Sequence, residues 1–386
     1  MAISVILKNV LLIATVAGFV YYLLCLVAAS SFFFQPAAKP GAAFPPVSVL
    51  VPLCGEDAEA YDNFSSLCSQ EYPDYQIVFG VRDSLDPVIK VIRQLEHDFP
   101  GRDIQLVISD ATIGENPKVS NLQNILARAK HEYLVIVDSD IRVGKDYLSA
   151  VVPCLEDQRI GLVTCLYRSS ITPNLASRLE ALGITTEFMP GVLVSRMIEG
   201  VRFALGATMA TTRQRLQLIG GFPKIANHLA DDYMLGYLMS AASFQIHLAS
   251  YVVETVQPVS SFMSMLKHQI RLSRGIRACR PLGYLGLIFT YGTVLSFFYG
   301  IVSRFSSGSL VLLAGSLALR GIAGLVIGGH WMKDKVVRKH FWLIPIRDML
   351  GFLVWSFGLF GRKVEWRGEL FELVKGGKIM RRVGGR

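Results

Sequence analysis

The sequence predicts an α/β domain with a mainly parallel, Rossmann-like sheet, and transmembrane helices on its N-terminal and C-terminal sides. Between residues 47 and 137, apolar strand-like segments alternate with helix-like segments at short spacing. This alternation is typical of a parallel sheet covered on both faces. Strands are expected at residues 47–51, 76–81, 104–108 and 134–137, and helices at 58–70, at 88–99 and after 116–121. A further strand at 161–166 and a largely helical segment at 174–194 are expected beyond them.

Four apolar segments predict an integral membrane protein. Residues 9–38 carry no charge, and 10–30 are long enough to cross a bilayer. A signal peptide is the alternative, but no basic cluster precedes this long segment, so an uncleaved anchor over residues 1–34 is expected. Residues 281–303 are also uncharged, 305–332 contain only Arg320, and 341–361 is interrupted by Arg347-Asp348. The mean hydropathy of +0.41 agrees with this assignment.

The charge is unevenly distributed along the chain. Residues 39–266 carry a net charge of −7, and residues 267–386 carry +15. Because the positive charge lies beside the apolar segments, it indicates membrane flanks and no nucleic acid partner. Such flanks are usually cytoplasmic, so a cytoplasmic domain over residues 40–258 is expected. The six cysteines show no metal-ligand spacing and no disulfide framework, which fits a reducing compartment.

The C-terminal third predicts three further parts. Residues 259–280 are expected to form an amphipathic interfacial helix, residues 281–361 a transmembrane or re-entrant region, and residues 362–386 a basic cytoplasmic tail. Three full spans would put the basic tail outside, against the positive-inside tendency. We therefore expect residues 341–361 to be re-entrant or interfacial, and Arg320 to face protein instead of lipid.

Acidic residues follow three of the predicted strands. Glu56 follows the first, Asp83 the second, and Asp138 and Asp140 the fourth. Ligands of open α/β sheets bind at the carboxyl ends of strands, where these acids would meet. Two carboxylates one residue apart can hold a divalent cation, which in turn can hold a diphosphate. The alternative for each acid is an ordinary turn or helix-capping role, which suffices for Asp57, Asp86, Asp103 and Asp146.

Two later segments carry further charged candidates. Asp231 and Asp232 begin an apolar helical segment, where acids can also simply satisfy the helix dipole. In residues 259–280 four basic residues share one helical face: Lys267, Arg271, Arg274 and Arg277. Lipid anchoring alone explains Lys267 and Arg277, whereas Arg271 can also point into a site. The sequence contains neither G-x-G-x-x-G nor G-x-x-x-x-G-K-[ST], which disfavours a Rossmann dehydrogenase and a P-loop NTPase.

Several ordered motifs resemble the ceramide glucosyltransferase family, glycosyltransferase family 21, and in particular its bacterial hopanoid-biosynthesis branch. The motifs are Pro52-Leu-Cys-Gly-Glu, Phe79-Gly-Val-Arg-Asp, Asn116-Pro-Lys-Val-Ser-Asn-Leu, Asp138-Ser-Asp-Ile-Arg-Val, Leu229-Ala-Asp-Asp-Tyr and His268-Gln-Ile-Arg. Ile344-Pro-Ile-Arg-Asp and Trp366-Arg-Gly extend the match toward the C-terminus. The resemblance implies a GT-A-type domain that moves a sugar from a UDP-sugar to a lipid hydroxyl with inversion at the anomeric carbon.

The resemblance also implies roles for the acids at the strand ends. Asp83 matches the acid that contacts uracil, and Lys118 lies in the motif that lines the nucleotide pocket. Glu56 is placed with them as a nucleotide-sugar contact. Asp138 matches the first acid of the Asp-x-Asp region, near ribose and metal, and Asp140 matches the metal-binding acid. The implied cofactor is a divalent cation, Mg²⁺ or Mn²⁺.

The remaining roles fall on the later segments. Asp232 matches the catalytic base, and Asp231 would raise its pKa through like charge. Arg271 matches the arginine of a Gln/Arg-x-x-Arg-Trp motif and would stabilise the leaving diphosphate. His268 occupies the first position of that motif and is placed in the nucleotide-sugar site. Leu272 stands where the family has Trp, which removes an aromatic surface beside the acceptor or the arginine.

The sequence therefore predicts a membrane hexosyltransferase whose partners are a UDP-sugar, a membrane lipid acceptor and the bilayer. N-acetylglucosamine on a hopanoid is favoured slightly over glucose on ceramide, and the bacterial inner membrane is the expected location. Two alternatives remain. A processive polysaccharide synthase is disfavoured by too few spans, and a catalytically impaired membrane scaffold is suggested only by Leu272.

Overall fold

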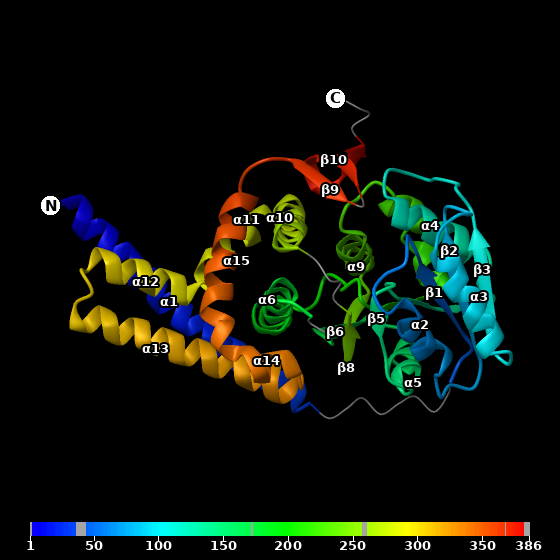
Figure 1. Cartoon of the computed structure of the whole chain (residues 1–386), viewed down its shortest axis with the longest axis horizontal. Coiled ribbons are helices and arrows are strands. Elements are labelled where there is room, and N and C mark those ends of the chain that lie inside the picture. Colours follow the sequence, from blue (N-terminus) through cyan, green and yellow to red (C-terminus); the bar gives the residue numbers. More distant parts are fainter. Residues whose placement is uncertain (1, 36–43, 171–172, 257–260, 367, 382–386) are drawn as a thin grey trace. The chain divides into compact units, whose positions relative to one another are not determined.

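The computed structural model describes residues 2–35, 44–170, 173–256, 261–366 and 368–381 (Figure 1). The chain divides into two compact units. The helical unit consists of Met1–Gln35, Thr172–Glu199 and Val259–Gly376, and the α/β unit of Pro36–Ile171, Gly200–Pro258 and Gly377–Arg386. Residues 172–199, which the sequence placed inside the 40–258 domain, thus group with the helical unit. The first residues of that expected domain, 40–43, lie outside the described part of the chain.

The α/β unit contains an eight-stranded sheet in the order β3-β2-β1-β4-β7-β6-β8-β5 (Figure 1). Its strands are β1 Val47–Pro52, β2 Tyr75–Val81, β3 Asp103–Ile108, β4 Tyr133–Ile136, β5 Ile141–Arg142, β6 Ile160–Ser169, β7 Met209–Thr212 and β8 Gln245–Thr255. Strands β3, β2, β1 and β4 pair in parallel. Strand β7 is antiparallel to both β4 and β6, and β8 is parallel to β6 and antiparallel to β5. The prediction of a mainly parallel sheet is confirmed.

Helices cover both faces of this sheet. They are α2 Ala60–Cys68, α3 Val88–Asp98, α4 Pro117–Leu126, α5 Tyr147–Val151, α8 Arg213–Leu218 and α9 Asp231–Ala241. Apolar residues of α2, α3 and α5 share one core with Val47, Val49 and Val51. Residues of α4, α8 and α9 share the opposite core with Leu50. Alternate residues of β1 therefore face opposite layers, which explains why the strand is apolar at every position except Ser48.

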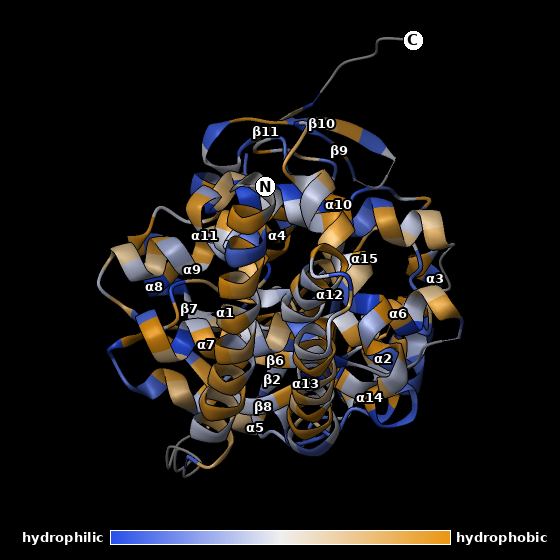
Figure 2. Ribbon diagram, turned by 90° about the vertical axis from the view of Figure 1, so that its left-hand side faces the viewer, coloured by the Kyte–Doolittle hydropathy of each residue, from blue (hydrophilic) through white to orange (hydrophobic). Residues whose placement is uncertain are grey.

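The helical unit contains the apolar segments. Its helices are α1 Ala2–Phe33, α6 Leu175–Gly183, α7 Met189–Glu199, α10 Phe262–Cys279, α11 Pro281–Gly286, α12 Gly292–Val302, α13 Ser307–Gly324, α14 Lys335–His340 and α15 Ile344–Gly358. Short π-helical segments, Ile184–Phe188 and Leu325–Trp331, follow α6 and α13. Helices α1, α12 and α13 pack side by side (Figure 1). Hydrophobic residues predominate along α1 and α13 (Figure 2).

Among the described residues, three helical segments are long and apolar enough to cross a membrane: Val5–Phe33, Ser307–Trp331 and Lys335–Gly358. The uncharged segment 281–303, expected in the transmembrane or re-entrant region, is bent, and Pro281–Thr290 meets Gly292–Val302 at 63°. The chain leaves helical geometry at Tyr291, whose ψ is 46°. The bend therefore lies here. Residues 341–361 were expected to be re-entrant or interfacial, and 341–358 belong to Lys335–Gly358, a helical segment of spanning length.

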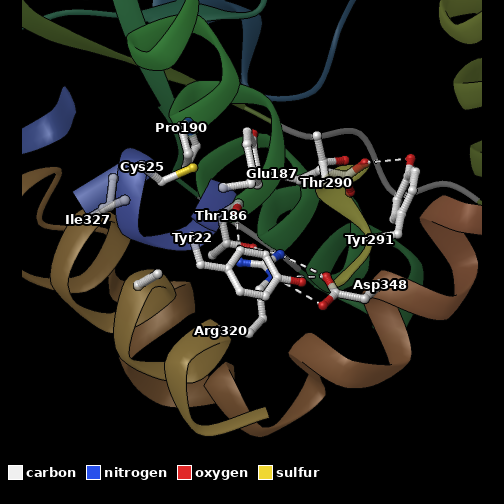
Figure 3. Close-up of a pocket in the computed structure, with 12 residues that line it drawn as sticks. Tyr22, Cys25, Thr186, Glu187, Pro190, Thr290, Tyr291, Arg320, Ile327 and Asp348 are labelled. Atoms are coloured by element: carbon white, nitrogen blue, oxygen red, sulfur yellow. Dashed lines mark hydrogen bonds and ion pairs between the residues drawn. The ribbon is translucent and has the colours of Figure 1, made fainter. Parts of the chain in front are cut away.

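Two buried arginines inside the helical unit are paired with carboxylates, and Figure 3 shows one of these pairs, Arg320 with Asp348. Arg320 is 5% exposed and contacts Asp348 with an Nη2 to Oδ1 distance of 2.7 Å. It also donates a hydrogen bond of 2.8 Å to the Thr186 carbonyl in the first π-helical segment. Arg347 Nη2 lies 3.0 Å from Glu187 Oε2. Arg320 thus faces protein, as the sequence predicted, because a guanidinium in an apolar unit requires a carboxylate partner.

Candidate active site

The Asp138-Ser139-Asp140 turn follows β4, a strand that lies between β1 and β7 in the sheet. Two neighbouring segments hold the turn. Thr255, at the end of β8, donates a hydrogen bond of 2.7 Å to Asp140 Oδ2. Ser139 donates a hydrogen bond to Asp57, in the loop after β1. The Asp140 carboxylate is therefore fixed by a group at another strand end, and Ser139, between the two acids, is held by the loop after β1. Both acids follow β4, where the sequence placed them.

Lys118 joins the turn to the second acidic motif. Asn116 begins α4, and its Oδ1 accepts hydrogen bonds from the backbone N–H of Lys118 at 2.9 Å and of Val119 at 3.1 Å. With the first turn of α4 fixed in this way, Lys118 Nζ lies 2.7 Å from Asp138 Oδ1 and 3.1 Å from Asp231 Oδ2. A single ammonium group therefore bridges residues 93 positions apart in the sequence.

Asp232, at the start of α9, completes the cluster. Its Oδ2 accepts a hydrogen bond of 3.0 Å from the Gly206 backbone N–H, and its Oδ1 accepts one of 2.7 Å from Tyr233 N–H. A Cβ at Gly206 would lie 3.2 Å from Asp138 Oδ2 and 3.3 Å from Asp232 Oδ2. Both carboxylates thus face the same backbone position, and glycine leaves the space between them open.

The loop that precedes the acidic pair is tied to two other segments of the α/β unit. Asn116 Nδ2 donates a hydrogen bond of 2.7 Å to the His228 carbonyl. On the other side, Leu229 N–H donates to Gly377 O at 3.0 Å, and Ile379 N–H donates to Asn227 O at 2.8 Å. The C-terminal residues 377–381, expected only as part of a basic tail, therefore brace this loop; residues 382–386 lie outside the described chain.

The environment of the cluster raises the pKa of its carboxyl groups. Burial raises the pKa of Asp140 to about 6, and the neighbouring charge of Asp138 adds to the shift. Burial and the charge of Asp231 raise the pKa of Asp232 to about 6, while Lys118 opposes them. Burial likewise raises the pKa of Asp138. Burial lowers the pKa of Lys118, but Asp138 and Asp231 outweigh it, so the net shift is upward and the lysine stays charged.

The donor set near β4 fits a cation that is shared with a ligand. No group of three or more His, Cys, Asp or Glu side chains suited to a metal is found among the described residues. Asp138 and Asp140 can supply two carboxylates. Mg²⁺ is commonly held by one or two carboxylates together with substrate phosphates and water. These residues therefore fit a divalent cation bound with a diphosphate, and not a site built from protein ligands alone.

Glu56 and Asp83 lie in the loops after β1 and β2, and both are exposed. Asp83 Oδ1 accepts a hydrogen bond of 2.9 Å from Leu85 N–H. Asp86, expected to be a helix-capping residue, accepts from Val88 N–H at 3.0 Å and from Gly55 N–H at 2.8 Å. Its carboxylate thus holds the start of α3 against the loop that carries Glu56.

His268 and Arg271 lie on α10 in the helical unit. His268 Nδ1 lies 2.7 Å from Oε1 of Glu180, a residue of α6. The Arg271 guanidinium lies 5.6 Å from the centroid of the Trp366 ring. The structure therefore brings Lys118, Asp138, Asp140 and the acidic pair together in the α/β unit, and it places the two α10 residues on the helical unit.

Two supporting residues were missed by the sequence. Asp57 was interpreted as an ordinary turn residue, although its carboxylate bonds the Asp138-Ser139-Asp140 turn. Its position directly after Glu56 was the available signal. Thr255 lies on β8, a strand that was not predicted, because Gln245–Thr255 mixes polar and apolar residues without strict alternation. No local pattern indicated that this threonine would reach Asp140.

Comparison with known proteins identifies the family. Residues 10–379 match the model described as glycosyl transferase family 21. Ceramide glucosyltransferase 3 of Caenorhabditis elegans is 22% identical over 402 residues, which cover 96% of this chain and 83% of that protein. Ceramide glucosyltransferase 1 of the same organism is 25% identical over 291 residues, covering 69% of this chain and 62% of that protein.

Among solved structures, the mannosyltransferase PcManGT from Pyrobaculum calidifontis, in complex with GDP-Man and Mn²⁺, has a similar fold. Its TM-score is 0.56 at 20% identity, and the match covers 90% of this chain and 98% of that one. This similarity confirms the predicted GT-A-type α/β fold with membrane helices. Because the family model spans nearly the whole sequence, the chain belongs to glycosyl transferase family 21 and is a membrane hexosyltransferase that takes its sugar from a nucleotide sugar.

Proposed function

We propose that the chain transfers glucose or N-acetylglucosamine from a UDP-sugar to the hydroxyl of a membrane lipid, with inversion at the anomeric carbon. The acceptor is a hopanoid or a ceramide-like lipid. Asp232 is the general base, and Arg271 stabilises the leaving diphosphate. Glu56, Asp83, Lys118, Asp138 and His268 are proposed to contact the nucleotide sugar, and Asp138 and Asp140 to hold a divalent cation.

One observation carries this proposal: Lys118 bridges Asp138 and Asp231 at 2.7 Å and 3.1 Å. The bridge unites the acids after β4 with the acids at the start of α9. A displacement reaction requires the diphosphate site and the base to flank one sugar carbon. If the Asp-x-Asp segment were only a surface turn, there would be no reason for a half-buried lysine and a second acidic pair to converge on it.

In the proposed step, Asp232 accepts the proton of the acceptor hydroxyl as the hydroxyl oxygen forms a bond to the anomeric carbon. The bond from that carbon to the diphosphate oxygen breaks at the same time, and UDP leaves with the electron pair. A pKa of about 6 leaves Asp232 ionised at neutral pH, yet more basic than an ordinary aspartate. The Gly206 N–H and Tyr233 N–H hold the carboxylate in position.

Asp138 and Asp140 are proposed to hold the cation. When bound, a divalent cation supplies positive charge to the diphosphate and so favours its departure. Mn²⁺ accompanies the nucleotide sugar in the structurally similar mannosyltransferase. The protein's own contribution is positional, since Thr255 fixes the Asp140 carboxylate and Ser139 bonds Asp57.

The α/β unit is proposed to lie in the cytoplasm, in a bacterial inner membrane protein. Supporting this orientation, residues 267–386 carry a net charge of +15 beside the apolar helices. A cytoplasmic site meets UDP-sugars, and helices in the same chain keep it at the bilayer where a lipid acceptor resides. The tail's accessibility to a membrane-impermeant thiol reagent, after a cysteine is introduced at its end, tests the orientation.

The deciding experiment expresses the protein in membranes that contain candidate lipids, supplies defined UDP-sugars and identifies the products by mass spectrometry. We expect one hexose or N-acetylhexosamine per lipid. A polymer would identify a processive synthase instead, and no product with any donor would favour the impaired scaffold. Asp140→Ala should lose metal-dependent nucleotide binding, whereas Asp74→Asn, at a side chain that is 63% exposed, should behave as wild type. Metal-independent activity in the wild type would contradict the role given to Asp140.

A further inference from the structure

The basic face of α10, predicted to anchor the helix on lipid, contacts protein within the helical unit. Lys267, Arg274 and Arg277 of this face contact residues 359–365. Lys267 Nζ lies 3.0 Å from Glu365 Oε2. Arg274 donates to Lys363 O at 2.6 Å and to Phe360 O at 3.0 Å, and Arg277 donates to Leu359 O and Gly361 O. This segment therefore lies along the basic face over three turns of the helix.

Arg271, in the middle of this face, meets an aromatic ring. Its guanidinium carbon lies 5.6 Å from the centroid of Trp366. The flanking contacts fix the distance between helix and segment on both sides, because Lys267 lies one turn before Arg271 and Arg274 about one turn after it. The contacts of Lys267 and Arg274 therefore help to fix where the Arg271 guanidinium meets the Trp366 ring.

The ring itself is held in a hairpin. Strand β9 Lys363–Trp366 pairs antiparallel with β10 Glu369–Leu373, and Trp366 is directly opposite Glu369. The Trp366 ring also packs on Phe371, with ring centroids 6.3 Å apart, and Phe371 is 1% exposed. Trp366 thus contacts both a buried aromatic residue of the hairpin and the Arg271 guanidinium.

We propose that Trp366 is a positioning residue for Arg271, an inference that rests on the proposed role of Arg271 at the leaving diphosphate. An aromatic face attracts a guanidinium without neutralising its charge, and it leaves the in-plane N–H donors directed outward. A carboxylate in the same place would use those donors and cancel the charge. Position 272 does not supply the ring, because Leu272 is 50% exposed and aliphatic.

A double-mutant cycle tests this proposal on the full-length protein in membranes. We expect Arg271→Ala to lower kcat by about 100-fold or more. Trp366→Leu should lower kcat by about 3- to 30-fold, the range of a lost cation–π contact, with the KM for the UDP-sugar unchanged. In the Arg271→Ala background Trp366→Leu should change kcat less than about twofold, since a residue that acts through Arg271 has nothing left to position.

Three variants control the cycle. Trp366→Phe keeps a ring beside Arg271 and should restore most of the kcat lost in Trp366→Leu. Trp366→Met provides a second residue without a ring if the leucine variant fails to fold. Trp342→Leu makes the same substitution at a tryptophan of the helical unit that is 60% exposed and distant in sequence from this contact, and it should leave kcat unchanged.

The outcomes distinguish a failure of the role inferred for Trp366 from a failure of the role proposed for Arg271. The role of Trp366 is overturned, and that of Arg271 left intact, by either of two results in which Arg271→Ala is slow. In the first, the effects of the two substitutions are additive. In the second, Trp366→Leu has a normal kcat. A normal kcat in Arg271→Ala overturns the role proposed for Arg271 and the inference together. Equal losses in the leucine and phenylalanine variants also overturn the inference, because the ring is then not what matters.

Discussion

Replacing Asp232 by Asn should abolish transfer and, at neutral pH, stabilise the protein. The Asp232 carboxylate contributes to the fold through hydrogen bonds that an amide of the same shape would keep in part. It accepts hydrogen bonds of 3.0 Å from Gly206 N–H and 2.7 Å from Tyr233 N–H. Against these bonds stand its burial and the adjacent charge of Asp231, which raise its pKa. The substitution therefore removes an ionised group that the folded state disfavours.

The size of the effect follows from linkage. The pKa of Asp232 rises from 3.8 to about 6, so the folded protein binds this proton more tightly than the unfolded chain does. Stability from this group is complete below pH 3.8 and is lost as the pH rises through about 6. Ionised Asp232 thus lowers the free energy of unfolding by about 3 kcal/mol at pH 7, and by about half as much at pH 5.

Two corrections reduce the expected gain. Asp232 is only half-buried, and solvent screening lowers the destabilisation to about 2 kcal/mol at pH 7. Asparagine offers one acceptor oxygen where aspartate offers two, so one of the two hydrogen bonds is lost at about 1 kcal/mol. The net gain in the free energy of unfolding is about 1 kcal/mol, which corresponds to a rise in Tm of roughly 2–4 °C for a domain of this size.

The assay combines thermal unfolding with turnover at two pH values. The Tm of Asp232→Asn should exceed that of the wild type at pH 7, and the difference should shrink toward pH 5. Turnover should fall by about 10²- to 10⁴-fold, the usual contribution of a general base. In the wild type, kcat should decline below pH 6, leaving about a tenth at pH 5 as the base becomes protonated. Asp74→Asn controls for the loss of one acidic charge on the surface.

Two results would refute this reasoning. A Tm for Asp232→Asn that lies below the wild-type value at pH 7 would mean that the ionised carboxylate stabilises the fold. A near-normal turnover would mean that another group takes the acceptor proton.

Three further predictions concern supporting contacts. Thr255→Val removes the donor to a proposed metal-binding carboxylate, so the Mn²⁺ concentration for half-maximal activity should rise about 10- to 100-fold; an unchanged metal requirement would contradict the role of Thr255. Deleting residues 377–386 should lower kcat more than about 10-fold, since the loop before the acidic pair loses the contacts that hold it. The control deletion of 382–386 alone should leave kcat unchanged. Equal kcat values for the two deletions would show that these contacts are dispensable. Arg320→Met should lower the free energy of unfolding of the helical unit by about 3–5 kcal/mol in thermal unfolding, because it leaves Asp348 buried without its partner. Adding Asp348→Leu should restore most of that loss. A double variant as unstable as Arg320→Met would show that the pair does more than balance charge.

Much of the fold could be predicted because its signals are local. The first four strands are mostly apolar, since both faces of the sheet are covered, and each is followed by a polar turn. The helix after Asn116 was also predictable, because an asparagine followed by proline is a common helix start. The later strands were harder, since β7 has only four residues and β8 pairs in parallel with β6 through two register shifts.

The candidate site was predicted in part, because some of its residues also follow local sequence signals. Strand ends marked Asp138 and Asp140, and the resemblance supplied Asp232. The hydrogen bonds from Thr255 and to Asp57 arise from tertiary contacts without a sequence pattern. The basic face of α10 shows a different limit. Helical spacing reveals that four basic residues share a face, but it does not reveal whether lipid or protein covers that face. The bend at Tyr291 is hidden for a similar reason, since hydropathy carries no information on backbone angles.

The balance of buried charge distinguishes the two kinds of ionisable cluster in this chain. In the helical unit two buried arginines each face one carboxylate, Arg320 with Asp348 and Arg347 with Glu187. Glycine also makes room there, because a Cβ at Gly183 would overlap the Arg347 guanidinium. In such one-to-one pairs each positive charge is balanced by one negative charge.

The cluster around Lys118 is arranged differently. One ammonium group contacts two carboxylates, Asp138 and Asp231, while Asp140 and Asp232 lie nearby with raised pKa values. The excess of negative charge destabilises the cluster in the absence of ligands, and a cation with its diphosphate is the kind of partner that relieves it. Folding stability alone would favour asparagine at position 232, so an aspartate there agrees with the proposed role of Asp232 as the general base.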